Sequence, residues 1–192
     1  MENILDIKTR EEFRAWLAAN HNIEKECFIA VKRGRPTDKK QLWYLDAVEE
    51  ALCFGWIDSV AKKIDGVDYQ RFSPRRKYSN WTEQNKERIR RLEKLGMMTD
   101  AGRAVLPDMS FVENDEIVQD LQDAGVLEIF RTFPELYQKI RLYNLDFYKR
   151  KIPAQYENKL NVCIKNTKAG KMYGNWDDYG RLVNYPHLPL RA

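Results

Sequence analysis

The residue types best suited to chemistry gather between positions 56 and 81, where tryptophans and arginines accompany Asp58. An arginine side chain is planar and binds phosphate or carboxylate groups through two parallel N–H donors. Tryptophans beside it would limit the access of water, and an aspartate would orient its guanidinium group. We therefore expect one anion-binding pocket, formed by Trp56, Asp58, Arg71, Arg75, Arg76, Ser79 and Trp81.

A hairpin with a two-residue turn at Asp65-Gly66 would bring these residues together. An Asp-Gly pair between two strand-like runs is a strong short-range hairpin signal. With this turn Arg75 lies opposite Trp56, and Asp58 is diagonal to both Arg71 and Arg75, within reach of long side chains. The same register pairs Ile64 with Val67, Lys63 with Asp68, Val60 with Arg71 and Asp58 with Ser73.

The same residues also have a purely structural interpretation. Asp58 and one arginine would form a salt bridge that fixes the start of the sheet, while Trp56 and Tyr69 belong to the core. Structural ion pairs of this kind are common in proteins. The sequence leaves both interpretations open.

Nucleophilic and metal-binding residue types give little support to catalysis. Cys53 would lie at a helix C-terminus, where the helix dipole opposes a low thiol pKa, and no histidine is near it in the sequence. The only histidines are His21 and His187, and neither Cys-x-x-Cys nor His-x-x-x-His occurs. We expect no catalytic residue, no metal, no cofactor, and reduced thiols at Cys27, Cys53 and Cys163.

Charge is distributed unevenly along the chain. The segment Arg71–Arg91 has eight basic and two acidic residues, a net charge of +6, and contains Tyr78 and Trp81 for base stacking. The segment Glu113–Glu128 has six acidic residues and no basic one. Nucleic-acid binding by the basic segment is therefore an alternative function. The whole-chain charge of only +4 and the compensating acidic segment count against it.

Composition restricts the class of protein. The chain has 192 residues, of which 43% are hydrophobic and 32% charged, which suits an ordered domain with a packed core. No apolar run approaches the ~20 residues that a membrane span needs. The N-terminal residues lack the basic and apolar stretches of a signal peptide. We expect a cytoplasmic protein without a membrane span.

Local patterns predict the elements that must position the pocket. Thr9 and Glu12 form a capping-box pattern that predicts a helix, and residues 26–32 predict a strand. Helices are also predicted at residues 45–54, which Gly55 would end, at 82–96, from Pro134 as the first helical residue, and at 154–167. The predicted fold class is α+β. Residues 1–106 form a small antiparallel sheet with packed helices, and residues 107–192 form a mostly helical region packed on it.

Three short motifs carry a resemblance to a known family. They are ALCFGWID at residues 51–58, SPRR at 73–76 and Ser79-Asn80-Trp81, in that order. With them the chain resembles the YdeI/OmpD-associated family, also called the bacteriocin-protection family, over roughly residues 12–102. The C-terminal part departs from the more common ending of that family. The resemblance implies a protective phenotype and an α+β fold, and no defined chemistry.

These observations lead to one main hypothesis and two alternatives. The main hypothesis is a bacteriocin-protection or stress protein that acts by binding an anionic small molecule or a protein partner. The first alternative is an enzyme that acts on an anionic small molecule through Asp58 and Arg75. The second is a nucleic-acid-binding protein that uses Arg71–Arg91.

Overall fold

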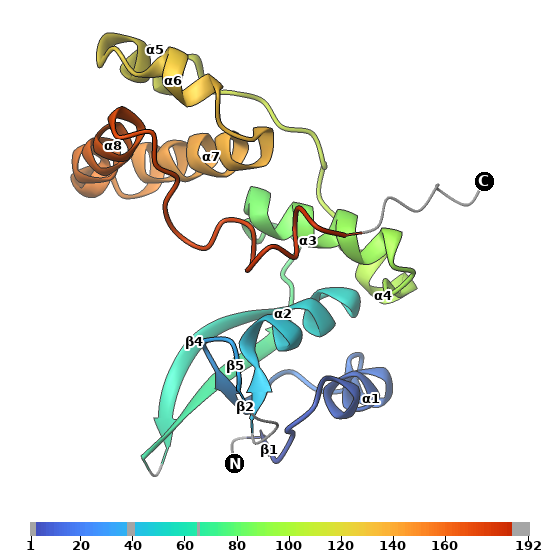
Figure 1. Cartoon of the computed structure of the whole chain (residues 1–192). Helices are drawn as coiled ribbons and strands as arrows, with labels where there is room; N and C mark the ends of the chain where they lie inside the picture. Colours follow the sequence, from blue (N-terminus) through green and yellow to red (C-terminus); the bar gives the residue numbers. More distant parts are fainter. Residues whose placement is uncertain (1–2, 38–40, 65, 186–192) are drawn as a thin grey trace. The chain divides into compact units, whose positions relative to one another are not determined.

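The computed structural model describes residues 3–37, 41–64 and 66–185, and its contacts divide the chain into two compact units. The first contains residues 3–80 and 88–107, and the second contains residues 81–87 and 108–185 (Figure 1). The fold is α+β with a helical C-terminal half, as predicted. The elements are β1 (Ile4–Leu5), α1 (Arg10–Asn20), β2 (Cys27–Lys32), β3 (Leu42–Trp43), α2 (Tyr44–Cys53), β4 (Trp56–Ile64), β5 (Val67–Pro74), α3 (Glu83–Lys94), α4 (Asp100–Arg103), α5 (Asp115–Asp123), α6 (Leu127–Arg131), α7 (Glu135–Lys151) and α8 (Pro153–Lys168).

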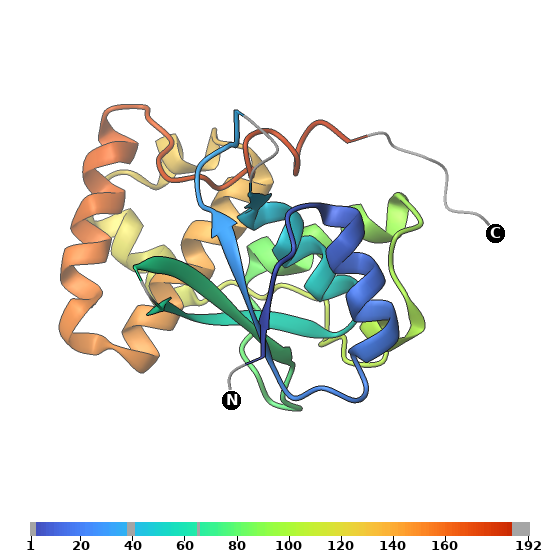
Figure 2. The ribbon, with the colours of Figure 1, turned by 90° about the horizontal axis from the view of Figure 1, so that it is seen from below.

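The sheet of the first unit is mixed, whereas the sequence analysis predicted a purely antiparallel one. Its strand order is β1-β2-β5-β4, and β3 also pairs with β2 (Figure 2). The long strands are antiparallel, but β1 and β3 run parallel to β2. Helix α1 lies between β1 and β2 in the sequence, so the chain can return and enter β2 in the direction of β1. The two missed pairings involve strands of two residues each, which have no recognisable alternation.

The β4–β5 hairpin follows the predicted register only near its turn. Ile64 pairs with Val67, as expected, although Asp65 lies outside the described residues. Between Asp58 and Ala61 the register shifts by one residue, so that Asp58 pairs with Phe72. The pairings predicted beyond this β-bulge, Asp58 with Ser73 and Trp56 with Arg75, are therefore wrong, and Val60 and Arg71 lie within the bulge.

The side chain of Gln70 accounts for the β-bulge. Gln70 is 1% exposed, and its Nε2 donates to the carbonyl oxygen of Ser59 at 2.9 Å and more weakly to that of Val60 at 3.4 Å. A bulge leaves backbone carbonyl groups without ladder partners, and the buried amide of Gln70 itself needs acceptors. The amide of Gln70 donates to these carbonyl groups, so the extra residue in β4 is tolerated.

Helices α1 and α2 begin and end on signals that the sequence contains. The capping box at Thr9 is confirmed, because its hydroxyl accepts from the Glu12 amide and the Glu12 carboxylate accepts from the Thr9 amide. Gly55 has a φ of +74°, the left-handed conformation that glycine adopts most easily after a helix. This residue turns the chain from α2 directly into β4.

Aromatic side chains connect α1 to the sheet. Phe13 lies against Phe72 of β5, with ring centroids 5.2 Å apart. Trp16 meets Trp56 of β4 edge to face at 5.7 Å. Contacts of this geometry add to the burial of large apolar rings, so they fix α1 on one face of the sheet.

Charged side chains are also buried in the first unit. Glu49 and Glu50 of α2 are both 0% exposed. Arg10 donates to Glu49 at 2.9 Å and to Glu50 at 2.5 Å, Arg14 donates to Glu50 at 2.7 Å, and Arg91 donates to Glu49 at 2.7 Å. These ion pairs connect α1, α2 and the part of α3 that belongs to this unit.

Helix α4 packs closely on the end of α2. A Cβ atom at Gly102 would lie 2.3 Å from the carbonyl oxygen of Cys53 and 2.7 Å from its carbonyl carbon. Thr99 also donates from its hydroxyl to this carbonyl oxygen at 2.5 Å. The contact therefore requires a residue without a side chain at position 102.

The second unit is an assembly of helices around its own core. Ile117 and Leu121 of α5, Phe130 of α6 and Leu145 of α7 are buried together. Helices α7 and α8 lie side by side in an antiparallel arrangement (Figures 1 and 2). Pro134 is the N-cap of α7, one position before the predicted one. Within the described residues, no helix is long and apolar enough to cross a membrane.

Replacing Glu50 by glutamine should destabilise the protein strongly. The change removes the negative charge from a buried site that faces Arg10 and Arg14. Removing one partner of a buried ion pair costs about 3–5 kcal/mol. Urea unfolding followed by circular dichroism measures the loss, with Glu11→Gln, an exposed position in α1, as the control. Equal stability of the two variants would contradict the prediction.

Replacing Gly102 by alanine should also destabilise the first unit. The new methyl group would clash with the backbone of Cys53, which cannot move as a flexible side chain can. Overpacking of this kind costs roughly 1–3 kcal/mol. Gly34→Ala is the matched control, because a Cβ there meets nothing within 4 Å. Thermal unfolding of both variants tests the difference, and a Gly102→Ala protein as stable as the control would refute it.

Candidate functional site

The hairpin does not assemble the predicted pocket around Trp56 and Asp58. Trp56 is 1% exposed, lies against Trp16, and donates from Nε1 to the carbonyl oxygen of His21 at 3.0 Å. It is therefore a core residue, as the structural interpretation proposed. Asp58 accepts a hydrogen bond from Tyr44 at 2.6 Å, instead of lying between two arginines.

Arg71 and Asp58 lie on opposite faces of the sheet because of the β-bulge. Asp58 pairs with Phe72, so the neighbouring Arg71 points to the other face. There Arg71 donates to the carboxylate of Glu26 at 2.6 Å and to the hydroxyl of Ser59 at 3.1 Å. The expected contact between Asp58 and Arg71 is absent among the described residues.

The residues after β5 form a separate small group. Arg75 is 8% exposed and donates to the Ser79 hydroxyl and to the Asn80 carbonyl oxygen, both at 3.1 Å. Arg76 is exposed. Trp81 is half-buried and is the first residue of the second unit. Of the predicted site, Arg75 donates to the Ser79 hydroxyl, and the Ser79 amide donates to the carbonyl oxygen of Arg76 at 3.0 Å.

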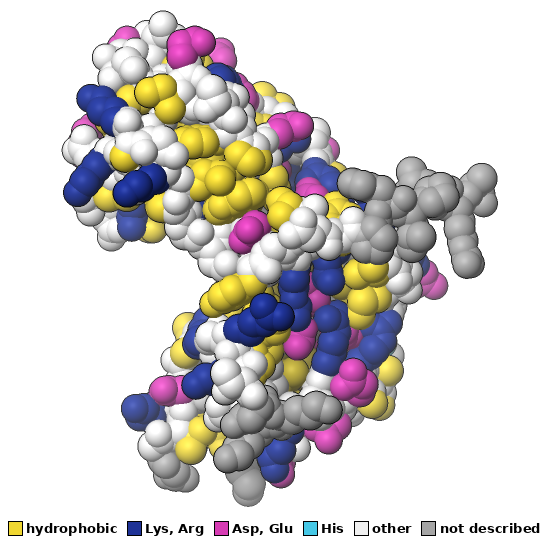
Figure 3. All heavy atoms as spheres, viewed as in Figure 1, with side chains coloured by type: hydrophobic (Ala, Val, Ile, Leu, Met, Phe, Trp, Pro, Cys, Tyr) yellow, Lys and Arg dark blue, Asp and Glu magenta, His cyan; other side chains and the backbone are white. Residues whose placement is uncertain are grey.

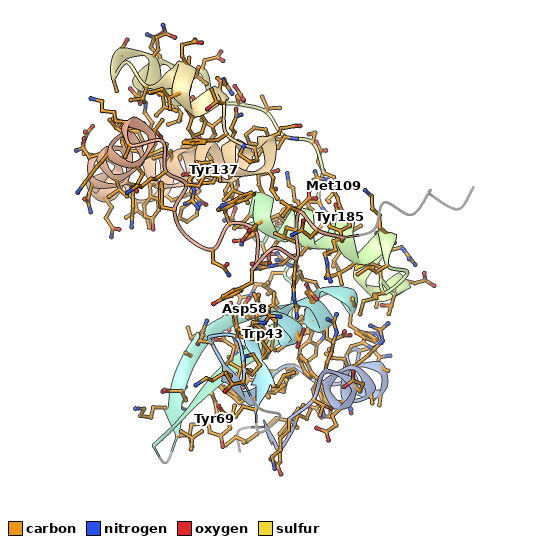
Figure 4. All side chains as sticks on the ribbon, viewed as in Figure 1. Trp43, Asp58, Tyr69, Met109, Tyr137 and Tyr185 are labelled. Carbon is orange, nitrogen blue, oxygen red and sulfur yellow. The ribbon has the colours of Figure 1, made fainter. Side chains whose placement is uncertain are left out.

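Asp58 instead belongs to a polar cluster at the start of α2. Tyr44 is the first residue of α2, and its hydroxyl donates to Asp58 of β4. Figure 4 labels Asp58 next to Trp43, the residue that precedes Tyr44. The guanidinium carbon of Arg33 lies 4.2 Å from the centre of the Tyr44 ring, a cation–π contact. Arg33 also donates to the buried Gln70, which supports the β-bulge. Asp58 therefore orients Tyr44, and the guanidinium group of Arg33 stacks on the ring of Tyr44.

The surroundings of Tyr44 keep its hydroxyl protonated. Burial raises the pKa of Tyr44, and the charge of Asp58 and the hydrogen bond to it act in the same direction. The positive charges of Arg88 and Arg33 act in the opposite direction. The pKa nevertheless stays above its usual value, so at neutral pH Tyr44 is a hydrogen-bond donor.

A hollow with a volume of about 670 Å³ lies beside this cluster in the first unit. It lies between the end of β2 and the β4–β5 hairpin. Asp68 at its wall is an exposed residue within 3.9 Å of Lys63. The net charge of its lining is positive. Its side walls include Lys32, Arg33, Gln41, Tyr69 and Gln70.

Three residues of this cluster, Arg33, Tyr44 and Gln70, were missed by the sequence analysis. Arg33 lies in a polar segment that reads only as a loop, and Tyr44 lies at a helix start without a side-chain cap. Neither belongs to a motif, and each gains its role from Gln70 or Asp58, which are distant in the sequence.

The basic segment Arg71–Arg91 is less available than its composition indicates. Arg71 pairs with Glu26, Lys86 with Glu83, and Arg91 with Glu49. On the face of the first unit in Figure 3, basic and acidic side chains lie next to one another. Charges that are already paired contribute little to phosphate binding, so this pattern does not favour a nucleic-acid interface.

The acidic segment Glu113–Glu128 is likewise paired within the second unit. Arg131 binds Glu113 at 2.7 Å. Lys149 lies 3.1 Å from both Glu116 and Asp120. Half of the six acidic side chains are thus bound to basic residues of the same unit.

The cysteines are free and buried. Burial raises the pKa of the Cys53 thiol to about 12 and raises the pKa values of Cys27 and Cys163 as well. A raised thiol pKa disfavours the reactive thiolate. The part of the chain that the structure describes, which excludes His187, contains no cluster of His, Cys, Asp and Glu that could hold a metal ion.

Comparison with known proteins finds one family. A family model described as "Domain of unknown function (DUF8412)" matches residues 5–105. No curated protein and no solved structure matches the chain. The matched range contains Arg33, Tyr44, Asp58 and Gln70, and therefore the whole polar cluster.

Tyr44 should make the stability of the protein fall at alkaline pH. An unfolded chain releases the tyrosine proton near pH 10, whereas the raised pKa keeps Tyr44 protonated in the folded state. The free energy of unfolding therefore decreases as the pH rises above about 10. Tyr44→Phe should make this decrease shallower in urea titrations at several pH values. Tyr78→Phe, at a side chain that is 89% exposed, is the control, and identical slopes for both would contradict the assignment.

Proposed function

The chain belongs to the DUF8412 family, a family of unknown function, and we propose that its first unit binds a small anion through Arg33. One observation carries this proposal. Arg33 stacks on Tyr44 and donates through one Nη2 hydrogen to Gln70, while its Nε and Nη1 donors have no partner among the described residues. An exposed guanidinium that is held in place and still has free donors is suited to a carboxylate or phosphate group.

The cluster lowers the cost of binding because it orients Arg33 beforehand. A free arginine side chain loses rotamer freedom when it binds, about 0.5–1.5 kcal/mol for an immobilised side chain. Tyr44 and Gln70 restrict Arg33 in the unbound protein. Asp58 acts as a positioning residue, since it fixes the tyrosine ring on which the guanidinium lies.

The charge around the hollow supports an anionic ligand. Lys32 lines it together with Arg33, and the side chain of Lys32 makes no hydrogen bond or ion pair with any described residue. A second positive charge strengthens the attraction and would bind a second oxygen of a phosphate or a dicarboxylate. The exposed position also makes this attraction sensitive to salt.

Binding without catalysis is the form of function that this cluster favours. Tyr44 remains protonated, so it cannot serve as a base at neutral pH, and Asp58 is occupied as its acceptor. The alternative of an enzyme acting through Asp58 and Arg75 loses support, because these side chains belong to different groups. The resemblance to the YdeI/OmpD-associated family remains our proposal for the wider role, that of a bacteriocin-protection or stress protein.

Isothermal titration with inorganic phosphate and with citrate, at low and high salt, tests the proposed function. Arg33→Ala should weaken binding at least ~10-fold, since a hydrogen bond to a charged group contributes about 1.5–3 kcal/mol. Tyr44→Phe keeps the ring but loses the bond to Asp58, so its effect should be smaller. Arg35→Ala removes an equal charge from the same exposed segment and should have little effect.

Two outcomes would overturn this assignment. One is equal binding by the wild type and the Arg33→Ala protein. The other is loss of binding in Arg75→Ala with Arg33→Ala unaffected, which would return the site to the residues after β5. Circular dichroism of each variant establishes that the fold is retained.

A further inference from the structure

The second unit contains a partly open hollow that the proposed anion site does not involve. It lies between the first turn of α3, the segment before α5, and α7, and its volume is about 140 Å³. A cavity of about 150 Å³ is large enough to admit a benzene molecule. The hollow therefore has the size of one six-membered ring.

Glu83 presents a buried acceptor at this hollow. The residue is 2% exposed, and its Oε1 lies 2.8 Å from Nζ of Lys86. Its Oε2 is also buried, and it has no hydrogen-bond partner among the described residues. Buried polar atoms are nearly always hydrogen-bonded, so an unpartnered carboxylate oxygen of a residue that lines a cavity points to a donor from outside the chain.

The other charged groups of the hollow are paired. Lys86 donates to Glu83 and to the carbonyl oxygen of Ser110, both at 2.8 Å. Asp146 accepts from Nδ2 of Asn114 at 2.8 Å and from Nε of Arg150 at 2.8 Å. The carboxylates of Glu83 and Asp146 are thus each balanced by one basic group.

The remaining wall is apolar or aromatic. Phe111, Leu142 and Tyr143 line the hollow, and Leu142 is 2% exposed. An apolar ring would gain about 25 cal/mol for each Å² of surface removed from water. A ligand of this size would thus gain both from the apolar wall and from the acceptor.

We propose that this hollow binds an uncharged single-ring molecule with one O–H or N–H donor, which bonds to Oε2 of Glu83. A ligand with a full charge would enter a site whose own charges already balance, and its desolvation would have no compensation. A neutral donor makes a charge-assisted hydrogen bond without adding charge. Phenol is the simplest probe of this class.

The test compares probes that differ in one property. Phenol, anisole, benzylammonium and benzoate are titrated into the isotopically labelled full chain, and the shifts of Phe111, Leu142 and Glu83 are followed by NMR. Anisole has the ring of phenol but no donor, and the other two add a positive or a negative charge. Phenol should bind at least ~10-fold more tightly than anisole, the value of a hydrogen bond to a charged group.

Two variants separate the role of Glu83 from general effects. Glu83→Gln removes the charge of the acceptor and should weaken phenol binding ~10-fold while leaving anisole binding unchanged. Glu157→Gln, at an exposed position of α8, is the matched control and should bind phenol like the wild type. If Glu83→Gln fails to fold, the comparison of the four probes on the wild-type protein still decides the question.

Several results would overturn the inference. One is the absence of saturable phenol binding, which would mean that the hollow holds water only. The others are equal affinity for phenol and anisole, and higher affinity for benzylammonium or benzoate than for phenol. Shifts confined to the first unit would do the same. The Arg33→Ala protein should bind phenol normally, so failure here and failure of the anion site are distinguishable.

Discussion

Glu49 and Glu50 lie side by side on α2, buried completely, and each is held by two arginines. A buried ion pair adds little net stability, because the loss of hydration offsets the attraction. Its effect is instead directional, since each carboxylate must face its guanidinium partners or remain uncompensated. The network thereby fixes α2 against α1 and against the later turns of α3. This arrangement also determines the positions of Tyr44, at the start of α2, and of Trp56, after its end.

The regular elements could be predicted from local chemistry. Thr9 caps α1, Gly55 ends α2, and Asn85 donates its amide to the hydroxyl of Thr82 at the start of α3, all as the residue types indicated. These signals act within a few residues, so they are visible in the sequence. The short strands β1 and β3 were not predictable, because two residues contain no periodicity.

The candidate site was predictable only in part, and Asp58 shows why. The sequence indicated that this carboxylate lies among basic and aromatic residues. The predicted partners, Arg71 and Arg75, were wrong, because Asp58 binds Tyr44 instead. The partner depends on the β-bulge, and the bulge depends on an amide at Gln70, which has no distinctive pattern in the sequence. Arg33 reaches the site only through Tyr44 and Gln70. Contacts between distant residues of this kind cannot be inferred from spacing along the chain.

The support that Gln70 gives to the β-bulge also has a consequence for how this family can change. The extra residue at Ser59 or Val60 and the amide at position 70 form one unit, since each is costly without the other. Deleting one residue there would make the β4–β5 ladder regular, while Asp58 keeps Phe72 as its partner. In an alignment of homologues, a one-residue gap at positions 59–60 should therefore coincide with loss of the glutamine at position 70. Chains with that gap would have no unpaired carbonyl group in β4 for the glutamine to bind.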